Sequence, residues 1–408
     1  MKKFFALLLS LAMVLALVAC GQKDPTPDTP DTPDDPQTKV EYKVAMITDY
    51  GDITDQSFNQ TTYEACKAFA EDNDIEFNYF KPVGDNTADR VAMIEKAADE
   101  GYNVIVMPGY AFGGAIVEAA PEFPDVKFIA LDVAAGDLLE TAVAKAGKTY
   151  DYTPDNWDLS EYVDMSNVYC AVYQEELCGY MAGYAAVKLG YKNLGFLGGM
   201  AVPAVVRYGY GFVQGVDAAA ADLGLTDVSL NYVYGGQFFG DADITAVMDT
   251  WYAGGTEVVF ACGGGIYTSA VDAAKKANAK VIGVDVDQAG VIAGYAGVEG
   301  MTVTSAMKGL YPTTYDTLTD VIVHGNWDAY KGKIATLGLV SGDDPELNYV
   351  QIPMGEGTQW SDSFTQDDYK AMVKDMFDGK ITVSNDVSKT PSDFATVIAV
   401  EDQGAIKG

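Results

Sequence analysis

Short apolar runs alternate with amphipathic stretches of helical periodicity along most of the chain. From residue 43 the apolar runs are KVAMIT, IEFNYFKP, NVIVMPG and VKFIALDV. A second series follows in the middle of the chain, with NLGFLGG, VSLNYVYGG, EVVFACGGG and KVIGVDVD. Continuous apolar strands separated by helices are typical of parallel sheets covered on both faces. Two complete series predict an α/β chain with two Rossmann-like, doubly wound domains.

The N-terminal residues have a different character. Lys2 and Lys3 precede an apolar run over residues 4–19, which is short for a membrane span and typical of a signal peptide. The run ends in LVACG, residues 17–21, which resembles the lipobox of bacterial lipoproteins. The resemblance implies that residues 1–19 are removed and that Cys20 is lipidated. A plain signal peptide with an incidental cysteine is the alternative.

Residues 20–40 combine the expected lipidated cysteine with a stretch rich in Pro and Asp. Such a composition predicts a stiff, extended, solvated tether. We therefore expect an extracytoplasmic protein that acyl chains such as palmitate anchor to the cell membrane. The sequence leaves open which envelope surface this is.

Composition narrows the choice of partners. The 408 residues carry 59 acids and 26 bases, a formal net charge of -33. A surface of this sign repels phosphate backbones, so we expect no nucleic acid partner. The length suggests two domains, and 49% hydrophobic against 21% charged residues is typical of a globular chain.

The sequence offers little for metal or catalytic chemistry. Its one histidine is His324, and no CxxC occurs, so we expect no metal site. The GxSxG, HExxH and GxGxxG spacings are also missing, which predicts no catalytic residues and no cofactor. Carboxylates alone can do acid–base work, so an enzyme such as a nucleoside hydrolase remains a minor alternative.

The cysteines beyond Cys20 are interpreted as small buried apolar residues. These are Cys66, Cys170, Cys178 and Cys262. Four cysteines allow three disulfide pairings, and the sequence does not choose among them.

Acidic side chains follow several of the apolar runs. Asp49, Asp132 and Asp285 each stand where such a run ends. Ligands of open α/β sheets bind beyond the carboxyl ends of the strands. A turn or cap role is the simpler interpretation of any one aspartate, but three at separate strand ends favour a binding site. The stretch TDYGDITDQSFNQ, residues 48–60, adds Phe58 and Asn59, with Asp55 expected to cap the next helix.

Several motifs resemble one family when taken together. DYGDITDQSFNQTTYEACKAFA resembles the D-x-G-x-x-x-D-x-S-F-N-Q-x-x-x-E signature of the basic membrane protein family. These are lipoprotein substrate-binding components of ABC transporters and include purine nucleoside receptor lipoproteins. The motifs that follow in the family's order are YQEELCGYMAGYAAVKLG, LGGMAVPAVVRYGYGFVQGV, YGGQFFGDA, KVIGVDVDQ and VTSAMK.

The resemblance implies a type I periplasmic-binding-protein fold, in which two lobes close on a ligand about a three-crossover hinge. We expect an N-terminal lobe from residues 41–173 plus 288–330 and a C-terminal lobe from residues 174–287 plus 331–408. Two crossings are expected near Tyr173 and Asp287. The third is expected after the helix that begins at Lys308.

The resemblance also implies a set of ligand-binding residues. Phe58 and Phe238 would stack on a base from opposite lobes, and Asn59 would bind a heterocycle edge. The sugar would be held by Asp49, Asp132 and Asp285, with Lys308 supplying the cation that their charges require.

Two details of the aromatic residues stay open at this point. Phe239 adjoins Phe238, so one of the two should pack on the sheet and the other should face the cleft. Tyr110 and Phe112 are expected to line the cleft as well.

The function implied is a lipid-anchored solute-binding protein of an ABC importer, with a purine nucleoside as ligand and a permease and an ATPase as partners. A sugar receptor of the same fold is one alternative. A ligand sensor that signals to a membrane kinase is another. The preferred nucleoside and its affinity are left open.

Overall fold

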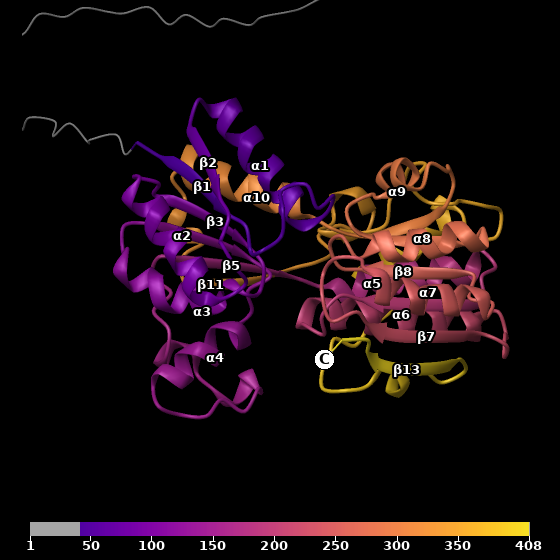
Figure 1. Ribbon diagram of the computed structural model, residues 1–408. Coiled ribbons are helices and arrows are strands. Elements are labelled where there is room, and N and C mark those ends of the chain that lie inside the picture. The colour runs from indigo at the N-terminus through magenta and orange to yellow at the C-terminus, as the bar shows by residue number, and fades with distance from the viewer. Residues whose placement is uncertain (1–40, 408) are drawn as a thin grey trace, which may run out of the picture. The chain divides into compact units, whose positions relative to one another are not determined.

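The structure is a computed structural model that describes residues 41–407 (Figure 1). The expected signal peptide, the lipidation site at Cys20 and the Pro/Asp-rich tether lie outside the described residues. From Tyr42 onward the chain forms one compact unit built on two sheets. None of the helices in the described part has the length and apolarity needed to cross a bilayer.

The first sheet has six parallel strands in the order β11-β5-β4-β3-β1-β2. Their bounds are β1 (Lys43–Ile47), β2 (Glu76–Phe80), β3 (Val104–Pro108), β4 (Lys127–Leu131), β5 (Val168–Tyr173) and β11 (Lys333–Leu337). The helices of this lobe are α1 (Phe58–Asn73), α2 (Thr87–Asp99), α3 (Phe112–Ala119), α4 (Ala135–Lys145) and α10 (Leu310–Leu318). We call this sheet and its helices the N-terminal lobe.

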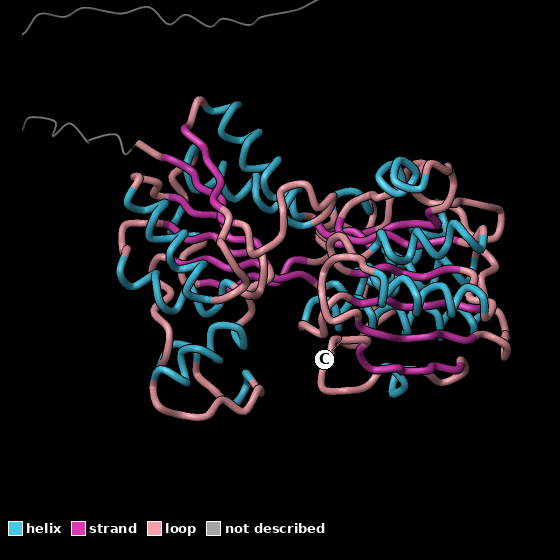
Figure 2. Tube along the Cα trace, in the orientation of Figure 1, coloured by secondary structure: helices cyan, strands magenta, loops and turns pink. Residues whose placement is uncertain are grey.

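Strand alternation divides the core of the N-terminal lobe between the two faces of the sheet. Val44 and Met46 pack in one cluster with Cys66 and Phe69 of α1. Ala45 and Ile47 pack in a second cluster with residues of α2 and α3. Both faces are therefore covered, as the continuous apolar strand KVAMI predicts (Figure 2).

The second sheet has seven strands in the order β12-β10-β9-β8-β6-β7-β13. Their bounds are β6 (Asn193–Gly198), β7 (Ser229–Tyr234), β8 (Val258–Cys262), β9 (Lys280–Asp285), β10 (Thr302–Lys308), β12 (Val350–Gln351) and β13 (Ala399–Ala405). The helices of this lobe are α5 (Glu175–Lys188), α6 (Pro203–Asp222), α7 (Ala242–Ala253), α8 (Tyr267–Ala277), α9 (Ala289–Ala296) and α11 (Gln366–Phe377). We call this sheet and its helices the C-terminal lobe. Only β12 among these strands pairs in antiparallel fashion.

The chain changes sheet three times, after β5, after β10 and after β11. The crossing at Tyr173 lies where it was expected, and the third also follows α10. The second crossing lies after Lys308 and not near Asp287, so the expected boundaries at 288 and 330 differ from the observed sheets. The reason is that TVTSAMK forms a buried strand parallel to β9, with the short α9 as its connection.

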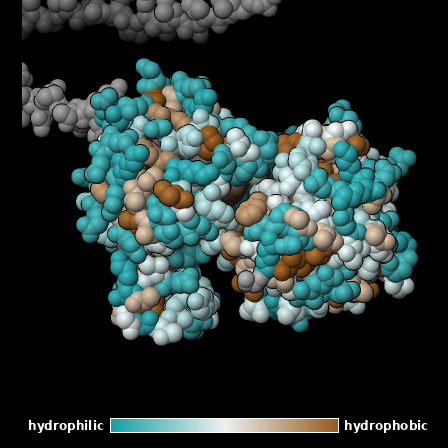
Figure 3. All heavy atoms as spheres, in the orientation of Figure 1, coloured by the Kyte–Doolittle hydropathy of each residue, from teal (hydrophilic) through white to brown (hydrophobic). Residues whose placement is uncertain are grey.

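The four cysteines of the described residues are buried and unpaired. This confirms their interpretation as small apolar residues. The face drawn in Figure 3 is largely hydrophilic, with hydrophobic residues in small groups. Such a surface fits the high net charge of the chain.

Helices α5 and α6 pack unusually closely because glycines line their contact. Gly179 and Gly183 on α5 face the backbone of α6, while Gly211 and Gly215 on α6 face the backbone of α5. A Cβ at Gly183 would lie 2.4 Å from the carbonyl oxygen of Phe212, closer than real Cβ atoms approach. Small residues at this spacing let helix backbones meet directly, as in membrane helix pairs.

The close α5–α6 contact predicts the effect of adding one methyl group. Gly183→Ala should lower the free energy of unfolding by about 2 kcal/mol, because the helices must separate or distort. Gly294→Ala is the matched control, since Gly294 lies in α9 with no atom near its absent Cβ. The control should stabilise the protein by about 0.5–1 kcal/mol through helix propensity. Urea denaturation measures both, and equal effects of the two variants would contradict this account.

Candidate functional site

A cavity of about 440 Å³ lies where the strands of both sheets end. Its lining includes Asp49 after β1, Gly109 after β3 and Asp132 after β4. From the C-terminal lobe it includes Asp285 and Lys308, the last residues of β9 and β10. This is the position at which α/β sheets bind ligands, and the volume is within the usual range of small-molecule sites.

The structure brings all seven sequence-predicted ligand residues to this one cavity. They are Asp49, Phe58, Asn59, Asp132, Phe238, Asp285 and Lys308. They come from strand ends, from the first turn of α1 and from the loop between β7 and α7. Within the described residues, no group of His, Cys, Asp or Glu side chains is arranged to hold a metal ion.

Lys308 is the centre of the charged part of the cavity. Its ammonium group pairs with Asp132, and it lies 3.5 Å from Glu175 Oε1 and 3.8 Å from Asp285 Oδ1. It is 5% exposed. Burial alone would lower the pKa of Lys308, but these carboxylates outweigh it and hold the pKa above its ordinary value. Lys308 is therefore a permanently charged group under physiological conditions.

The ammonium group of Lys308 also lies against aromatic rings. Its nitrogen is 4.6 Å from the ring centre of Phe58 and 5.4 Å from that of Tyr173. The ring of Tyr208 is 5.6 Å away. These cation–π contacts join the charged part of the cavity to its aromatic part and cover one face of Phe58.

Asp132 holds an acceptor with no partner. One of its oxygens bonds Lys308, while Oδ1 is buried without a hydrogen bond. Burial raises the pKa of Asp132 to about 6, although Lys308 acts to lower it. An orphaned buried oxygen is costly unless a ligand satisfies it. The backbone of Asp132 has φ +59°, a conformation that Asp tolerates better than most residues.

Asp285 connects the two lobes. Ser57 Oγ of the N-terminal lobe donates to Asp285 Oδ2 at 2.5 Å, and Tyr208 Oη donates to Oδ1 at 3.3 Å. Next to it, Gln288 Nε2 donates to the carbonyl oxygen of Gln56 at 3.1 Å. Asp285 also adopts a positive φ, +65°. Both strand-end aspartates that face Lys308 thus adopt the left-handed backbone conformation.

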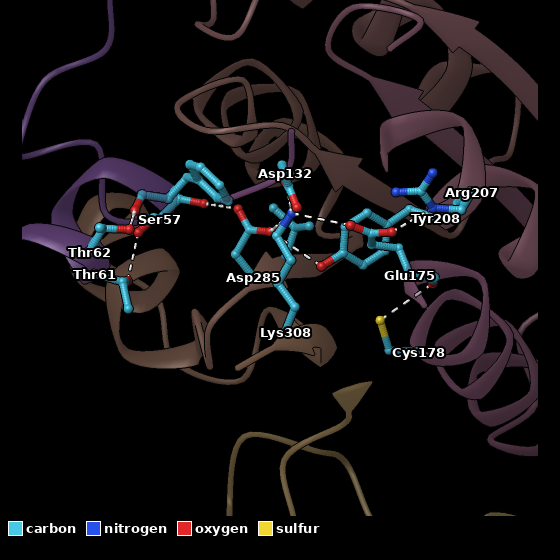
Figure 4. Close-up of polar contacts among 12 residues, drawn as sticks. Ser57, Thr61, Thr62, Asp132, Glu175, Cys178, Arg207, Tyr208, Asp285 and Lys308 are labelled. Atoms are coloured by element: carbon cyan, nitrogen blue, oxygen red, sulfur yellow. Dashed lines mark hydrogen bonds and ion pairs between the residues drawn. The ribbon is translucent and has the colours of Figure 1, made fainter. Parts of the chain in front are cut away.

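Glu175 and Arg207 belong to the same cluster, although neither was predicted from the sequence as a site residue. Arg207 Nε donates to Glu175 Oε2 at 2.7 Å, and the cluster runs on through Lys308 to Asp132 and Asp285 (Figure 4). Glu175 is fully buried at the start of α5. The signal was available, because each is a charged residue inside an apolar helical motif, YQEELCGYMAGY and PAVVRYGYGF.

Asn59 is placed to hold Asp49. Its Nδ2 donates to Asp49 Oδ1 at 3.2 Å and to Asp55 Oδ2 at 3.0 Å. Asp49 Oδ1 also accepts the backbone N–H groups of Tyr50 and Gly51. Burial nevertheless raises the pKa of Asp49 above its ordinary value. Asn59 is 4% exposed, and these two contacts engage its amide donors.

The expected cap at Asp55 is confirmed. Its carboxylate accepts the backbone N–H groups of Ser57, Asn59 and Gln60 at 2.9–3.1 Å. Asn59 and Gln60 lie in the first turn of α1, where backbone N–H groups have no partner within the helix, and Ser57 directly precedes it. The cap fixes the first turn of α1, which carries Phe58.

Aromatic side chains form the other part of the cavity lining. The rings of Tyr50 and Phe238 both line the cavity and lie in tilted contact, with their centres 6.4 Å apart. Phe238 is half-buried against the glycine backbone at Gly199 and Gly263, whereas Phe239 is 55% exposed. Both phenylalanines reach the cavity, so the expectation that one would leave it was wrong.

Tyr110 lines the cavity as expected, but Phe112 does not. Phe112 is fully buried in the core beneath the first sheet, where it begins α3. The reason is tertiary packing, because the Phe112 side chain joins the core cluster that includes Ile116 and Phe128, whereas Tyr110 precedes the helix.

Asp137 is a further acid at the cavity. It lies in the first turn of α4 and accepts the backbone N–H of Ala134 at 2.7 Å. Burial raises its pKa to about 7, against the effects of that hydrogen bond and of Arg207. Asp137 is therefore partly protonated near neutral pH in the folded chain.

Comparison with known proteins gives a consistent result. A family model described as ABC transporter substrate-binding protein PnrA-like matches residues 42–343. The ABC transporter nucleoside-binding protein BmpA of Lactococcus lactis subsp. cremoris is 25% identical over 392 residues, which cover 92% of this chain and 96% of that protein. Basic membrane protein B of Borreliella burgdorferi is 24% identical over 322 residues, 76% of this chain and 83% of that protein.

Solved structures confirm the predicted fold. An ABC transporter solute-binding protein of Aeropyrum pernix K1 superposes with a TM-score of 0.60 at 20% identity, over 86% of this chain and 90% of that chain. One from Conexibacter woesei gives a TM-score of 0.59, also at 20% identity, over 84% and 99%. At these identities the likeness concerns the fold alone.

The raised pKa of Asp137 predicts a pH-dependent stability difference. At pH values between the ordinary pKa of an aspartate and about 7, Asp137 is more protonated in the folded state than in the unfolded state. Its contribution to the free energy of unfolding therefore falls as the pH rises through this range. Asp137→Asn keeps an acceptor for the Ala134 N–H and removes the charge. The variant should therefore gain a few degrees of melting temperature over the parent at pH 8, and less at pH 4.5. The exposed Asp155→Asn is the control, and an equal gain at both pH values would contradict the assignment.

Proposed function

Because this chain belongs to the PnrA-like family of ABC transporter substrate-binding proteins, we propose that its cavity binds a purine nucleoside. As a substrate-binding protein the chain is not an enzyme. The observation that carries the proposal is the meeting of aromatic rings and a Lys308-centred group of carboxylates in one cavity. The aromatic rings would stack on a base, and the carboxylates would accept hydrogen bonds from the hydroxyl groups of a ribose. The nucleoside-binding relative from Lactococcus lactis supports the same ligand class.

The base would lie among the aromatic side chains. Phe58 and Phe238 come from different lobes, and the ring of Tyr50 contacts that of Phe238. Stacking of a base on one ring contributes about 1–3 kcal/mol, and burial of the flat heterocycle adds to it. Because the rings come from both lobes, a base between them would favour the closed arrangement.

The ribose would bind the strand-end carboxylates. Sugar hydroxyls are donors, and ionised carboxylates are acceptors only. Asp132 Oδ1 is a buried acceptor in need of a donor, and Asp285 and Asp49 lie on the same lining. Lys308 offsets the charges of Asp132 and Asp285, the two of these groups that it contacts.

The role of Asn59 is proposed to be indirect. Its amide donors are already used by Asp49 and Asp55, so it would orient Asp49 toward the ligand. This differs from the heterocycle contact that the family resemblance implies.

Transport and anchoring complete the proposal. Contacts such as Ser57–Asp285 join the lobes beside the cavity, and a permease would recognise the closed form before its ATPase drives import. The LVACG motif at residues 17–21 would place the acyl chains on Cys20 at the outer surface of the cell membrane.

The ligand class is tested by a thermal-shift screen of the mature chain against nucleosides, free bases and sugars. A ligand that binds only the folded state raises the melting temperature by mass action. Inosine or guanosine should raise it, while ribose and glucose should not. A shift with a monosaccharide alone would favour the sugar-receptor alternative and contradict the nucleoside proposal.

Phe238→Ala should weaken nucleoside binding about tenfold or more, measured by calorimetry. The reason is the loss of one stacking face. Phe377→Ala removes a ring that is exposed on α11 and serves as the matched control. Unchanged affinity in Phe238→Ala would show that this ring does not contact the base.

The cavity should discriminate against phosphorylated ligands. Its lining holds six aspartates, Asp49, Asp52, Asp55, Asp132, Asp137 and Asp285, against three cations, Lys81, Arg207 and Lys308. A phosphate adds about two negative charges, which such a lining repels. Inosine 5′-monophosphate should therefore bind at least about tenfold more weakly than inosine in parallel titrations. Equal affinities would contradict this electrostatic account.

A further inference from the structure

The C-terminal residues run along the C-terminal lobe and end beside the aromatic part of the cavity. We call residues 384–407 the C-terminal strap. They lie beyond the family match, which ends at residue 343. They include β13, the outermost strand of the second sheet (Figure 1).

Helix α6 holds the first part of the strap. Asp217 accepts the backbone N–H groups of Thr396, Val397 and Ile398 at 2.8–3.2 Å, and it also accepts the Thr396 hydroxyl. Further along α6, Gln214 exchanges two hydrogen bonds with the backbone of Ser384. One buried carboxylate thus holds three successive amides at the entry to β13.

Strand β13 carries the strap toward the cavity. It pairs in parallel with β7, and the backbone N–H of Ile406 donates to the carbonyl oxygen of Tyr234 at 2.8 Å. Trp251 Nε1 donates to Gln403 Oε1 at 3.1 Å. Tyr234 is the last residue of β7, so the end of the strap meets the loop that follows this strand.

That loop, residues 236–241, carries Phe238 and Phe239. Lys407 Nζ pairs with Asp241 and lies 3.6 Å from Asp243 Oδ2. Its nitrogen also contacts Gln237 Oε1 at 3.5 Å. Gly236 approaches the strap so closely that a Cβ there would lie 2.5 Å from the carbonyl oxygen of Lys407, and its φ of +81° also favours glycine.

Asp241 joins these contacts to the aromatic residues. Its carboxylate accepts the Nε2 of Gln237 at 2.8 Å, and the same Nε2 donates to the carbonyl oxygen of Phe239 at 2.9 Å. Asp241 Oδ1 also caps α7 through the N–H of Ile244. The hydrogen bond from Ile244 and the charge of Lys407 lower the pKa of Asp241 to about 2, so it stays ionised at physiological pH.

We propose that Lys407 is a positioning residue for the ligand cavity. Through Asp241 and Gln237 it fixes the loop 236–241, and so the places of Phe238 and Phe239 on the cavity lining. The proposal takes its ligand from the proposed function and its geometry from the contacts of Lys407, Asp241 and Gln237. The C-terminal strap thus contributes to the affinity of the cavity for its ligand, in addition to completing the second sheet.

The test compares three variants by nucleoside affinity, melting temperature and hydrogen exchange of the 236–241 peptide. Lys407→Met removes the charge, and Lys407→Arg restores it. Lys276→Met is the matched control, because Lys276 forms an exposed ion pair with Asp249 elsewhere on the same lobe. Lys407→Met should weaken inosine binding about two- to fivefold and speed exchange in the loop. Lys407→Arg should restore both values, and Lys276→Met should change neither.

Each outcome decides one of the two proposals. If inosine binds and Lys407→Met changes only the melting temperature, the strap is merely structural and the inference is overturned. If no nucleoside binds the parent protein, the proposed function fails. Hydrogen exchange of the 236–241 peptide in Lys407→Met then decides whether the strap fixes the loop. Should Lys407→Met not fold, salt provides the second readout, because 1 M NaCl screens this partly exposed pair. In the parent protein, salt should then speed exchange of the 236–241 peptide and weaken inosine binding. Salt that changes neither value would overturn the inference.

Discussion

The buried ammonium group of Lys308 is the constraint on which the cavity depends. Asp132 comes from the first sheet and Asp285 from the second, and without a cation between them their charges would repel each other across the lobes. Removing one partner of a buried ion pair costs about 3–5 kcal/mol, since the others are left uncompensated. Lys308 is the last residue of β10, at the point where the chain leaves the second sheet. The connection between lobes and the electrostatics of the cavity are therefore set by the same residue.

The close packing of α5 and α6 helps to hold this arrangement of charged groups in place. Glycines bring the two helix backbones together, and the N-terminal parts of these helices present Glu175 and Arg207 to each other. Glu175 in turn faces Lys308. Methyl groups at the glycine positions would separate the helices and so displace this ion pair, because Gly211 faces the backbone of Glu176 and Gly179 faces that of Tyr208.

Much of this site could be predicted from local sequence because strand ends are local features. Asp49, Asp132 and Asp285 follow apolar runs, and the parallel sheet then brings them to one edge. Glu175 and Arg207 were not predicted, because a charged residue inside an apolar helical motif indicates a buried polar contact but not its partner, which here lies on another helix. The strand AVEDQGA was also missed, because its exposed, acidic sequence has no alternation and depends on β7 for its conformation. Phe112 and the second crossing were misplaced for the same reason, as tertiary packing decided both.

The buried, unpaired cysteines have a practical consequence for following the motion of the lobes. Cys66, Cys170, Cys178 and Cys262 are shielded from solvent, and burial raises the pKa of each thiol, so none presents a reactive thiolate. A maleimide dye would therefore react selectively with a cysteine introduced on the surface of residues 41–407. One such label on each lobe would report domain closure by fluorescence in single molecules. No native cysteine in this part of the chain would have to be removed.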